Sequence, residues 1–319
     1  MHEFDLINKY FYNISKNNKF ALNLNDDVFF DKLNGTVVSV DTYNIFSHFI
    51  HFDSPNLVIK KILRSSISDL ICKGVNPKFY FISGSGNKKT FSKNNLYKLT
   101  QSLKSEHKKF GISLCGGDTT FSNKLSFTII SLGYSKNIVF RNNAKLSDDI
   151  YVTGNLGDSY LGLQILKNNI RTNKTISKYF VKKYYLPDLQ TKFSKYLLTT
   201  ANTSIDISDG LISDMDKLIN KQNLSYKIYE EKIPISNNLK KLIDIKKLKK
   251  INIISQGDDY QILFTAPKSK YRIIQNISKI TRTKISKIGE IISSKNKSLI
   301  VDKKGKKIVT KNKGYIHQF

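Results

Sequence analysis

Aspartates recur in this sequence in short segments that contain Gly, Ser or Thr, each beside the end of a predicted strand or helix. The densest is IDISDGLISDMD, residues 205–216, with four aspartates in twelve residues of a chain whose formal net charge is +28. Hard divalent cations such as Mg²⁺ bind carboxylate oxygens at about 2.1 Å and complete their coordination with water and substrate phosphates. Several converging clusters would hold several Mg²⁺ ions, which implies a polyphosphate ligand. The aspartates concerned are Asp26 and Asp27 in LNDDV, Asp41 in SVDT, Asp69 in SISD, Asp118 in CGGDTT, Asp206 and Asp209 in IDISDG, and Asp258 and Asp259 in QGDDY.

Each of these segments also has a purely structural interpretation. Asp209 precedes Gly-Leu-Ile and is suited to cap a helix that begins at residue 211, and Asp118 is suited to a turn. CGGDTT is the most specific segment, because two glycines let the backbone approach a ligand closely, the aspartate can bind a metal, and the threonines add hydroxyl groups. The number of such segments in one chain favours the metal interpretation.

Motifs of other nucleotide and metal sites are incomplete. SGSGNKKT, residues 83–90, lacks the spacing of a P-loop, and the protein-kinase motifs are missing. His48 and His51 have no further partner at zinc spacing, and neither Cys72 nor Cys115 belongs to a C-x-x-C pair. We therefore expect no structural zinc and two reduced thiols.

The positive charge is spread along the chain. Only five of the 53 basic residues are arginine, whereas a nucleic-acid reader usually concentrates arginine among aromatic residues on one face. We interpret the lysine excess as a bias of composition and expect no nucleic-acid partner, with a basic nucleic-acid-binding protein as the remote alternative. The charge would still attract polyanionic small molecules.

The sequence predicts a cytoplasmic protein with no membrane association. No apolar run approaches the about 20 residues that a membrane helix needs. The first residues, MHEFDLINKYF, place Glu3 and Asp5 where a signal peptide would have lysine and then an apolar stretch.

Apolar periodicity predicts alternating strands and helices, and a hydrophobic content of 39% over 319 residues is enough for a buried core. A polar stretch, residues 135–149, separates two halves, so we predict the α/β class with two domains, 1–137 and 138–319. The predicted strands are 36–40, 79–83, 125–135, 149–154, 225–229, 260–265, 284–290 and 298–302, and the predicted helices are 3–14, 56–72, 91–109, 157–167, 188–199 and 211–221.

The order of these motifs resembles the thiamine-monophosphate kinase family over essentially the whole chain. GGDTT, YVTGNLGDS and IDISDGL carry most of the resemblance, together with NDDV, SVDTYN, SISDLICKGVNPK, FRNNAK, SQGDDYQILFT and KGYIHQF. The resemblance implies the fold of a superfamily that also contains aminoimidazole-ribonucleotide synthetase and selenophosphate synthetase. In that fold, the sheet of an N-terminal α/β domain forms a barrel with a partner's sheet across a homodimer, and a second α/β domain completes the active site.

The activity that the resemblance implies is ATP-dependent phosphorylation of thiamine monophosphate to thiamine diphosphate, by direct in-line transfer with several Mg²⁺ ions. Val40 has no side-chain oxygen, so a metal contact there would use its backbone carbonyl. The implied metal ligands are Asp27, Ser39, Val40, Asp41, Asp69, Asp118, Asp206 and Asp209; the implied ATP contacts are Gly117, Asp118, Arg141 and Ser208; the implied thiamine contacts are His48, Asp258 and Tyr315; and the transfer step is assigned to Asp118, Asp209 and Arg141.

The chain departs from the family pattern at a few of these motifs. Asn23 and Asn25 replace glycines near Asp27, Asp258 replaces a glutamate, and Phe121 follows GGDTT where arginine is common. Two alternatives therefore stay open: another ATP-dependent enzyme of the same superfamily, and an inactive relative. Superfamily branches that depend on a reactive cysteine are disfavoured, because the sequence has no cysteine near either terminus.

Overall fold

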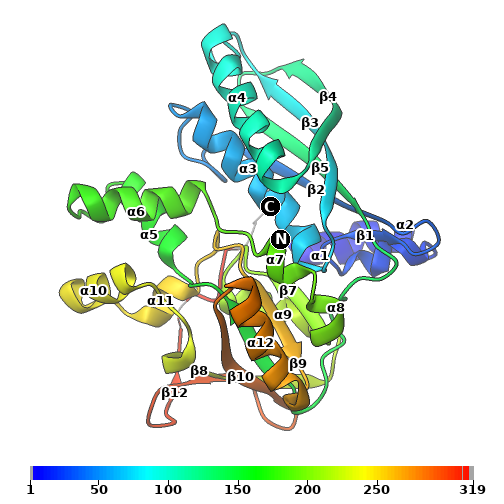
Figure 1. Ribbon diagram of the computed structural model, residues 1–319, viewed down its shortest axis with the longest axis vertical. Coiled ribbons are helices and arrows are strands. Elements are labelled where there is room, and N and C mark those ends of the chain that lie inside the picture. The colour runs from blue at the N-terminus through cyan, green and yellow to red at the C-terminus, as the bar shows by residue number, and fades with distance from the viewer. Residues whose placement is uncertain (1–2, 311, 316–319) are drawn as a thin grey trace.

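The chain folds around two β-sheets (Figure 1). The computed structural model describes residues 3–310 and 312–315. The first sheet has the strand order β1-β2-β5-β3-β4 and lies in the upper part of Figure 1. Within the described residues this sheet is open, with β1 and β4 at its edges. Its strands are β1 (Phe29–Asp31), β2 (Thr36–Asn44), β3 (Pro77–Gly86), β4 (Ser113–Phe121) and β5 (Ser126–Tyr134).

Helix α3 (Pro55–Cys72) connects the two halves of the fold, because it packs against strands of the first sheet and against β7 of the second. Proline at its first position has a fixed φ angle that suits a helix start. The helix stops before Gly74, whose φ of 81° lies in the left-handed region that glycine adopts without strain. Most residues of α3 are buried, polar ones included, so its polar side chains need partners inside the protein.

Helix α4 (Lys93–Phe110) makes the crossover between β3 and β4, which are parallel neighbours. Its N-terminus is capped by Ser92, whose side chain accepts a hydrogen bond from the backbone of Asn95, and it ends at Gly111 in the left-handed conformation. Helices α3 and α4 lie on the same face of the first sheet (Figure 1).

The second sheet has the order β12-β11-β8-β10-β6-β9-β7 and lies in the lower part of Figure 1. Its strands are β6 (Asp149–Thr153), β7 (Thr203–Asp206), β8 (Leu224–Tyr229), β9 (Ile262–Ala266), β10 (Ile285–Ser293), β11 (Leu299–Val301) and β12 (Lys307–Ile308). The other α-helices are α1 (Glu3–Leu6), α2 (Tyr12–Ser15), α5 (Asp158–Leu166), α6 (Lys174–Tyr185), α7 (Thr191–Ser194), α8 (Leu197–Thr200), α9 (Leu211–Leu218), α10 (Asn237–Lys246), α11 (Lys250–Ile254) and α12 (Tyr271–Thr281).

The mixed α/β class is confirmed, and each predicted strand and helix has a counterpart within a few residues. The predicted helix 188–199 is two short helices, α7 and α8. The helices α6, α10, α11 and α12 and the strands β1, β4, β7 and β12 were not predicted. The structural alternative of a turn at Asp118 was wrong, because CGGDTT lies inside β4. Gly117 permits this strand, since a Cβ there would lie 1.7 Å from the Ile82 carbonyl oxygen of β3.

Both halves of the chain contribute to one large apolar cluster, which includes Tyr43 and Ile62 from the first half and Tyr151 and Phe264 from the second. The division into domains at residue 138 stays a prediction. Among the helices of the described ranges, none has the length and apolar character that a membrane span requires.

Candidate active site

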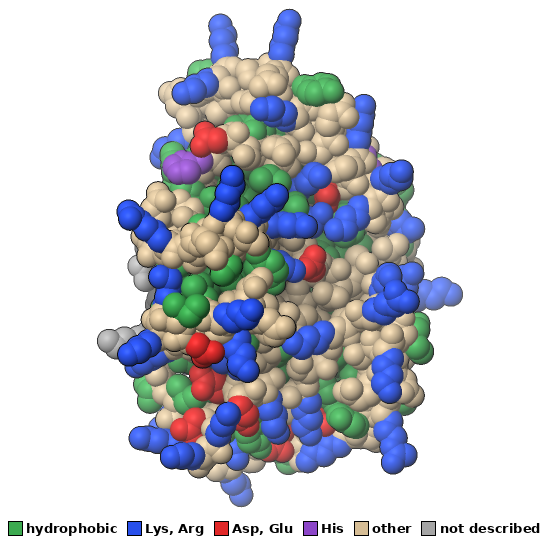
Figure 2. All heavy atoms as spheres, turned by 60° about the vertical axis from the view of Figure 1, so that its left-hand side comes forward, with side chains coloured by type: hydrophobic (Ala, Val, Ile, Leu, Met, Phe, Trp, Pro, Cys, Tyr) green, Lys and Arg blue, Asp and Glu red, His purple; other side chains and the backbone are tan. Residues whose placement is uncertain are grey.

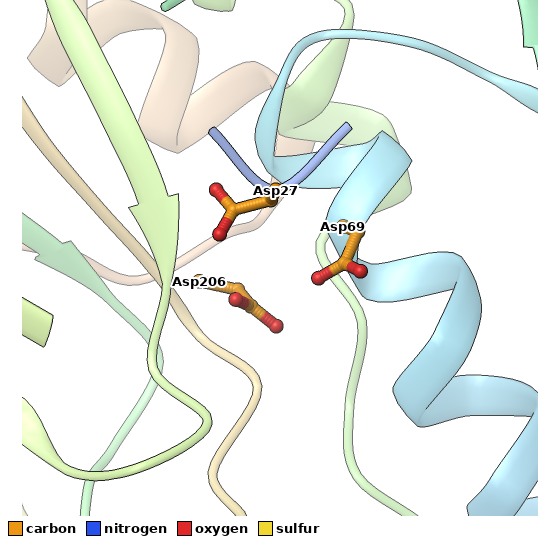
Figure 3. A group of neighbouring side chains, drawn as sticks. All are labelled: Asp27, Asp69 and Asp206. Atoms are coloured by element: carbon orange, nitrogen blue, oxygen red, sulfur yellow. The ribbon is translucent and has the colours of Figure 1, made fainter. Parts of the chain in front are cut away.

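Three carboxylates from distant parts of the chain converge where the two sheets meet (Figure 3). Asp27 lies in the loop before β1, Asp69 in the last turn of α3, and Asp206 at the end of β7. One oxygen of each carboxylate lies within 4.8 Å of the other two. All the donors are oxygen, the ligand type that Mg²⁺ prefers, so these residues fit the predicted metal.

Hydroxyl groups orient two of these carboxylates. The Ser39 hydroxyl donates to Oδ2 of Asp69 at 2.5 Å, and the Ser68 hydroxyl donates to Oδ2 of Asp206 at 2.7 Å. Ser39, which the family resemblance gives as a metal ligand, is therefore buried and turned toward Asp69 in this structure. Asp41, two residues further along β2, is a fourth carboxylate that lines the same cleft.

The carboxylates are held in an environment that disfavours their charge. Burial raises the pKa of Asp41 and of Asp206 to about 6. Burial, followed by the negative charges of Asp41 and Asp206, raises the pKa of Asp69 well above its usual value. A divalent cation would compete with the protons that such a cluster retains.

Two cations of the protein neutralise Asp27. Nζ of Lys73 lies 2.7 Å from Oδ1 of Asp26 and 2.7 Å from Oδ2 of Asp27. The Arg141 Nε donates to Asp27 at 3.1 Å, and its Nη2 contacts the other oxygen of the same carboxylate. The backbone N–H of Arg141 donates to Asp26 at 2.9 Å, so the loop of Arg141 is fixed against the loop of Asp27.

The structural alternative for Asp209, a cap of the helix that begins at residue 211, was wrong. The side chain of Asp214 accepts hydrogen bonds from the backbone N–H groups of Asp209 and Gly210, both at 3.0 Å, and so stabilises the start of α9. The Asp209 carboxylate instead forms an ion pair with Lys217. The dense aspartate segment therefore combines carboxylates that face the site with one that holds its helix in place.

A close approach of two loops brings Asp209 and Asp258 to the same site. A Cβ on Gly257 would lie 1.8 Å from the Ser208 carbonyl oxygen, so only glycine allows this contact. The backbone N–H of Asp258 donates to the same oxygen at 2.8 Å. Asp258 has a φ of 69°, a left-handed conformation that the paired loops hold.

Most of the predicted residues line one cleft of about 700 Å³ between the two halves of the chain. The cleft also contains Asp26, Lys217 and Tyr260. The predicted residues along it are Asp27, Val40, Asp41, His48, Asp69, Arg141, Asp206, Ser208, Asp209, Asp258 and Tyr315.

The three predicted thiamine contacts all line the cleft. His48 accepts a hydrogen bond from the backbone N–H of Asn44 at Nδ1, at 3.0 Å. The backbone N–H of Tyr315 donates to the Asp209 carbonyl at 2.9 Å, and this residue is 46% exposed. Nζ of Lys61 lies 2.8 Å from Asp258, so this carboxylate forms an ion pair with a buried lysine.

Gly117 and Asp118 lie outside this cleft. Both are exposed residues of β4, and the Asp118 carboxylate accepts a hydrogen bond from the backbone of Thr119 at 2.8 Å. In the sheet register Asp41 pairs with β5, β5 with β3, and β3 with Gly117, so three strand spacings separate β2 from β4. At about 4.8 Å per spacing, this is about 14 Å.

Several site residues were missed in the sequence. Lys61, Ser65 and Lys73 were not predicted, and together with the predicted Asp69 they follow one another at intervals of four, along one side of α3 and the residue after it. That four-residue spacing was the signal that could have revealed the two lysines. In a chain with 53 basic residues, a lysine alone carries no such signal.

The chain is similar to known proteins in both sequence and structure. Residues 25–134 match the family model described as AIR synthase related protein, N-terminal domain. A thiamine-monophosphate kinase from Buchnera aphidicola subsp. Acyrthosiphon pisum is 34% identical over 330 residues, which covers 99% of this chain and 98% of that relative. The solved structure of AaThiL complexed with AMPPCP and TMP has a TM-score of 0.85 at 26% identity, and the match covers 99% of this chain and 97% of that one. With a relative this similar over nearly its whole length, the chain belongs to the thiamine-monophosphate kinase family.

Proposed function

We propose that this chain transfers the γ-phosphoryl group of ATP to thiamine monophosphate, giving thiamine diphosphate and ADP. The observation that carries the proposal is the group of Asp27, Asp69 and Asp206 within 4.8 Å, in a cleft that the predicted thiamine contacts also line. Relatives described as thiamine-monophosphate kinases support it. The match to a structure complexed with AMPPCP and TMP supports the same pair of substrates.

The nucleophile would be a phosphate oxygen of thiamine monophosphate, whose second pKa of about 6 leaves it mostly dianionic at neutral pH. This oxygen forms a bond to the γ-phosphorus while the bond from that phosphorus to the bridging oxygen of ADP breaks. No proton must be removed for the attack, which suits a cleft whose polar groups are mainly carboxylates and cations. We infer direct transfer without a phosphoenzyme.

The main barrier is the repulsion between two anions, so the residues must supply positive charge. Asp27, Asp41, Asp69, Asp206 and Asp209 would hold Mg²⁺, which when bound neutralises phosphate charge and aligns the two substrates. Of the protein's own cations in the cleft, Arg141 can offer its planar guanidinium to phosphate oxygens. Moving it from Asp27 to a phosphate would also free a carboxylate oxygen for the metal.

A panel of phosphate acceptors tests this assignment. With ATP and Mg²⁺, we expect ADP release with thiamine monophosphate and no release above background with free thiamine or with the ribonucleotide precursor of aminoimidazole ribonucleotide. ADP release would be measured with a coupled assay. Release only with the aminoimidazole precursor would favour a different enzyme of the superfamily, and no release with any acceptor from a folded protein would favour the inactive relative.

Magnesium should stabilise the protein more strongly at pH 7.5 than at pH 5. The raised pKa values of Asp41 and Asp206, both about 6, mean that the folded state holds more protons than the unfolded state between about pH 4 and pH 6. Without metal, the stability from these groups is present at low pH and is lost as the pH rises through 6. Mg²⁺ replaces the protons, so its effect grows over the same interval.

At a hundred times its dissociation constant, Mg²⁺ should raise Tm by about 3–5 °C at pH 7.5 and by less than about 1 °C at pH 5. Differential scanning calorimetry at both pH values, with EDTA as the reference, measures the effect. Equal shifts at both pH values would contradict the assignment of these carboxylates as metal ligands.

We also propose that the chain works as a homodimer. On the sheet face opposite to α3 and α4, Val40, Ile130 and Phe81 form a row in direct register across β2, β5 and β3. Their exposed fractions are 61%, 36% and 38%, which leaves an apolar row facing solvent in the single chain. A second copy covering this face would place its own β4 near the row, and with it the outlying Gly117 and Asp118.

The absence of a nucleic-acid partner stays a prediction. On the face shown in Figure 2, lysine and arginine side chains are scattered from end to end and are not gathered into one patch. A continuous basic patch with aromatic residues would be expected of a nucleic-acid binder. The cytoplasmic location stays a prediction.

A further inference from the structure

Lys73 is a lysine buried within an acidic cluster. Its exposed fraction is 0%, and it lies directly after the last residue of α3. Nζ is 2.7 Å from Asp26, 2.7 Å from Asp27 and 2.8 Å from the backbone carbonyl of Ser204. An ammonium group has three N–H donors, and here each has an oxygen partner. The three oxygens together form a cation-binding site, and the Lys73 ammonium group fills it.

The oxygen partners of Lys73 keep its ammonium group charged. Two of its three partners are carboxylates at 2.7 Å, and such partners favour the charged ammonium form. A buried lysine without such partners would lose its proton instead.

Lys73 and Arg141 hold the same carboxylate in different ways. Arg141 lines the cleft, so an incoming phosphate can recruit its guanidinium. Lys73 is absent from the cleft lining and is tied to β7 through Ser204, so a ligand in the cleft cannot reach it. Of the two cationic side chains that contact Asp27, Arg141 can move to a ligand in the cleft, whereas Lys73 stays with the carboxylate.

We propose that the Lys73 ammonium is a permanent cation of this site, in a place between Asp26 and Asp27 that a divalent ion would otherwise take. It is a positioning residue: its ammonium group contacts Asp27 and the backbone carbonyl of Ser204, and so holds the Asp27 loop against β7. The inference rests on the proposed magnesium site, and it means that this chain needs one divalent ion fewer than a site without the lysine.

The test counts bound Mn²⁺ without nucleotide by electron paramagnetic resonance. Lys73→Met keeps the apolar stem but lacks the terminal nitrogen, and it should bind one Mn²⁺ per chain more than the wild type. In EDTA this variant should melt at a lower temperature, and Mn²⁺ should restore its Tm more than it raises that of the wild type. Lys250→Met is the matched control, because Lys250 is a partly buried lysine that binds two backbone carbonyls away from the cleft. It should keep the wild-type Mn²⁺ count.

The double variant Lys73→Met with Asp26→Asn removes one charge of each sign. It should fold in EDTA and bind the wild-type number of Mn²⁺ ions, which keeps the test decisive if the single variant does not fold. An unchanged count in Lys73→Met, or a double variant that cannot fold, overturns the proposal for Lys73 while leaving the magnesium site intact. If neither the wild type nor Lys73→Met binds Mn²⁺, the magnesium site itself is wrong.

Discussion

Asp206→Asn is expected to lower the turnover of thiamine monophosphate by about a thousandfold or more, because loss of a metal ligand removes several kcal/mol of charge stabilisation from the transition state. Asp206 is one of the three converging carboxylates and is almost fully buried. Asparagine keeps the size of the side chain and can still accept the hydrogen bond from Ser68, so the fold should survive. Turnover at saturating Mg²⁺, together with a thermal melt, measures both effects.

Asp149→Asn provides a matched control for this variant. Asp149 is also buried, but it pairs with Ala266 at one end of β9, whereas Asp206 pairs with Ile262 at the other. Its charge partner is Lys287, at 2.6 Å, which does not line the cleft. The control should lose some stability and keep its turnover. Near-normal turnover in Asp206→Asn would refute the assignment of this carboxylate to the metal site.

The second large effect concerns Asp118, which lies about three strands from the cleft in the single chain. Asp118→Asn alone is expected to lower turnover by several orders of magnitude, although the residue lines no part of the cleft of its own chain. The reason is that the partner's β4 would complete each active site. A hybrid dimer of Asp118→Asn and Asp206→Asn chains would then contain one site with both wild-type aspartates and one site with neither.

Mixing the two inactive variants should therefore restore activity. In a random one-to-one mixture about half of the dimers are hybrids with one intact site each, so about a quarter of the wild-type turnover should return. Co-expression with two different affinity tags, followed by purification on both, isolates the hybrid and should yield about half. Mixed preparations that stay inactive while light scattering reports a dimer would show that Asp118 acts within its own chain.

The sequence predicted well those elements whose signals are local. Helix α3 was expected from residue 56 to residue 72 and spans Pro55–Cys72, because its apolar run agrees with the stop signals of Gly74 and Pro77 after it. Strand β4 was missed because its two glycines and its aspartate are residue types that are depleted in strands. Its existence depends on the approach of β3 to Gly117, a contact between residues far apart in the chain.

The residues of the site could likewise be predicted where their signals are local. Aspartates beside glycine and serine stand out in a basic chain, and most of those named do line the cleft. The roles of Asp214 and Asp209 could not be separated, because which of two nearby carboxylates caps the helix depends on backbone geometry. The distance of Asp118 from the cleft follows from the strand order β2-β5-β3-β4, which local sequence does not encode.

The central claim is that the chain makes thiamine diphosphate from thiamine monophosphate at a magnesium site built from aspartates. The measurement that tests it most directly is chromatography of a reaction that contains the purified protein, ATP, Mg²⁺ and thiamine monophosphate. We predict a thiamine diphosphate peak that grows in proportion to protein and disappears when EDTA is added. A folded protein that binds ATP and forms no thiamine diphosphate, or one whose product formation is unaffected by EDTA, would contradict the claim.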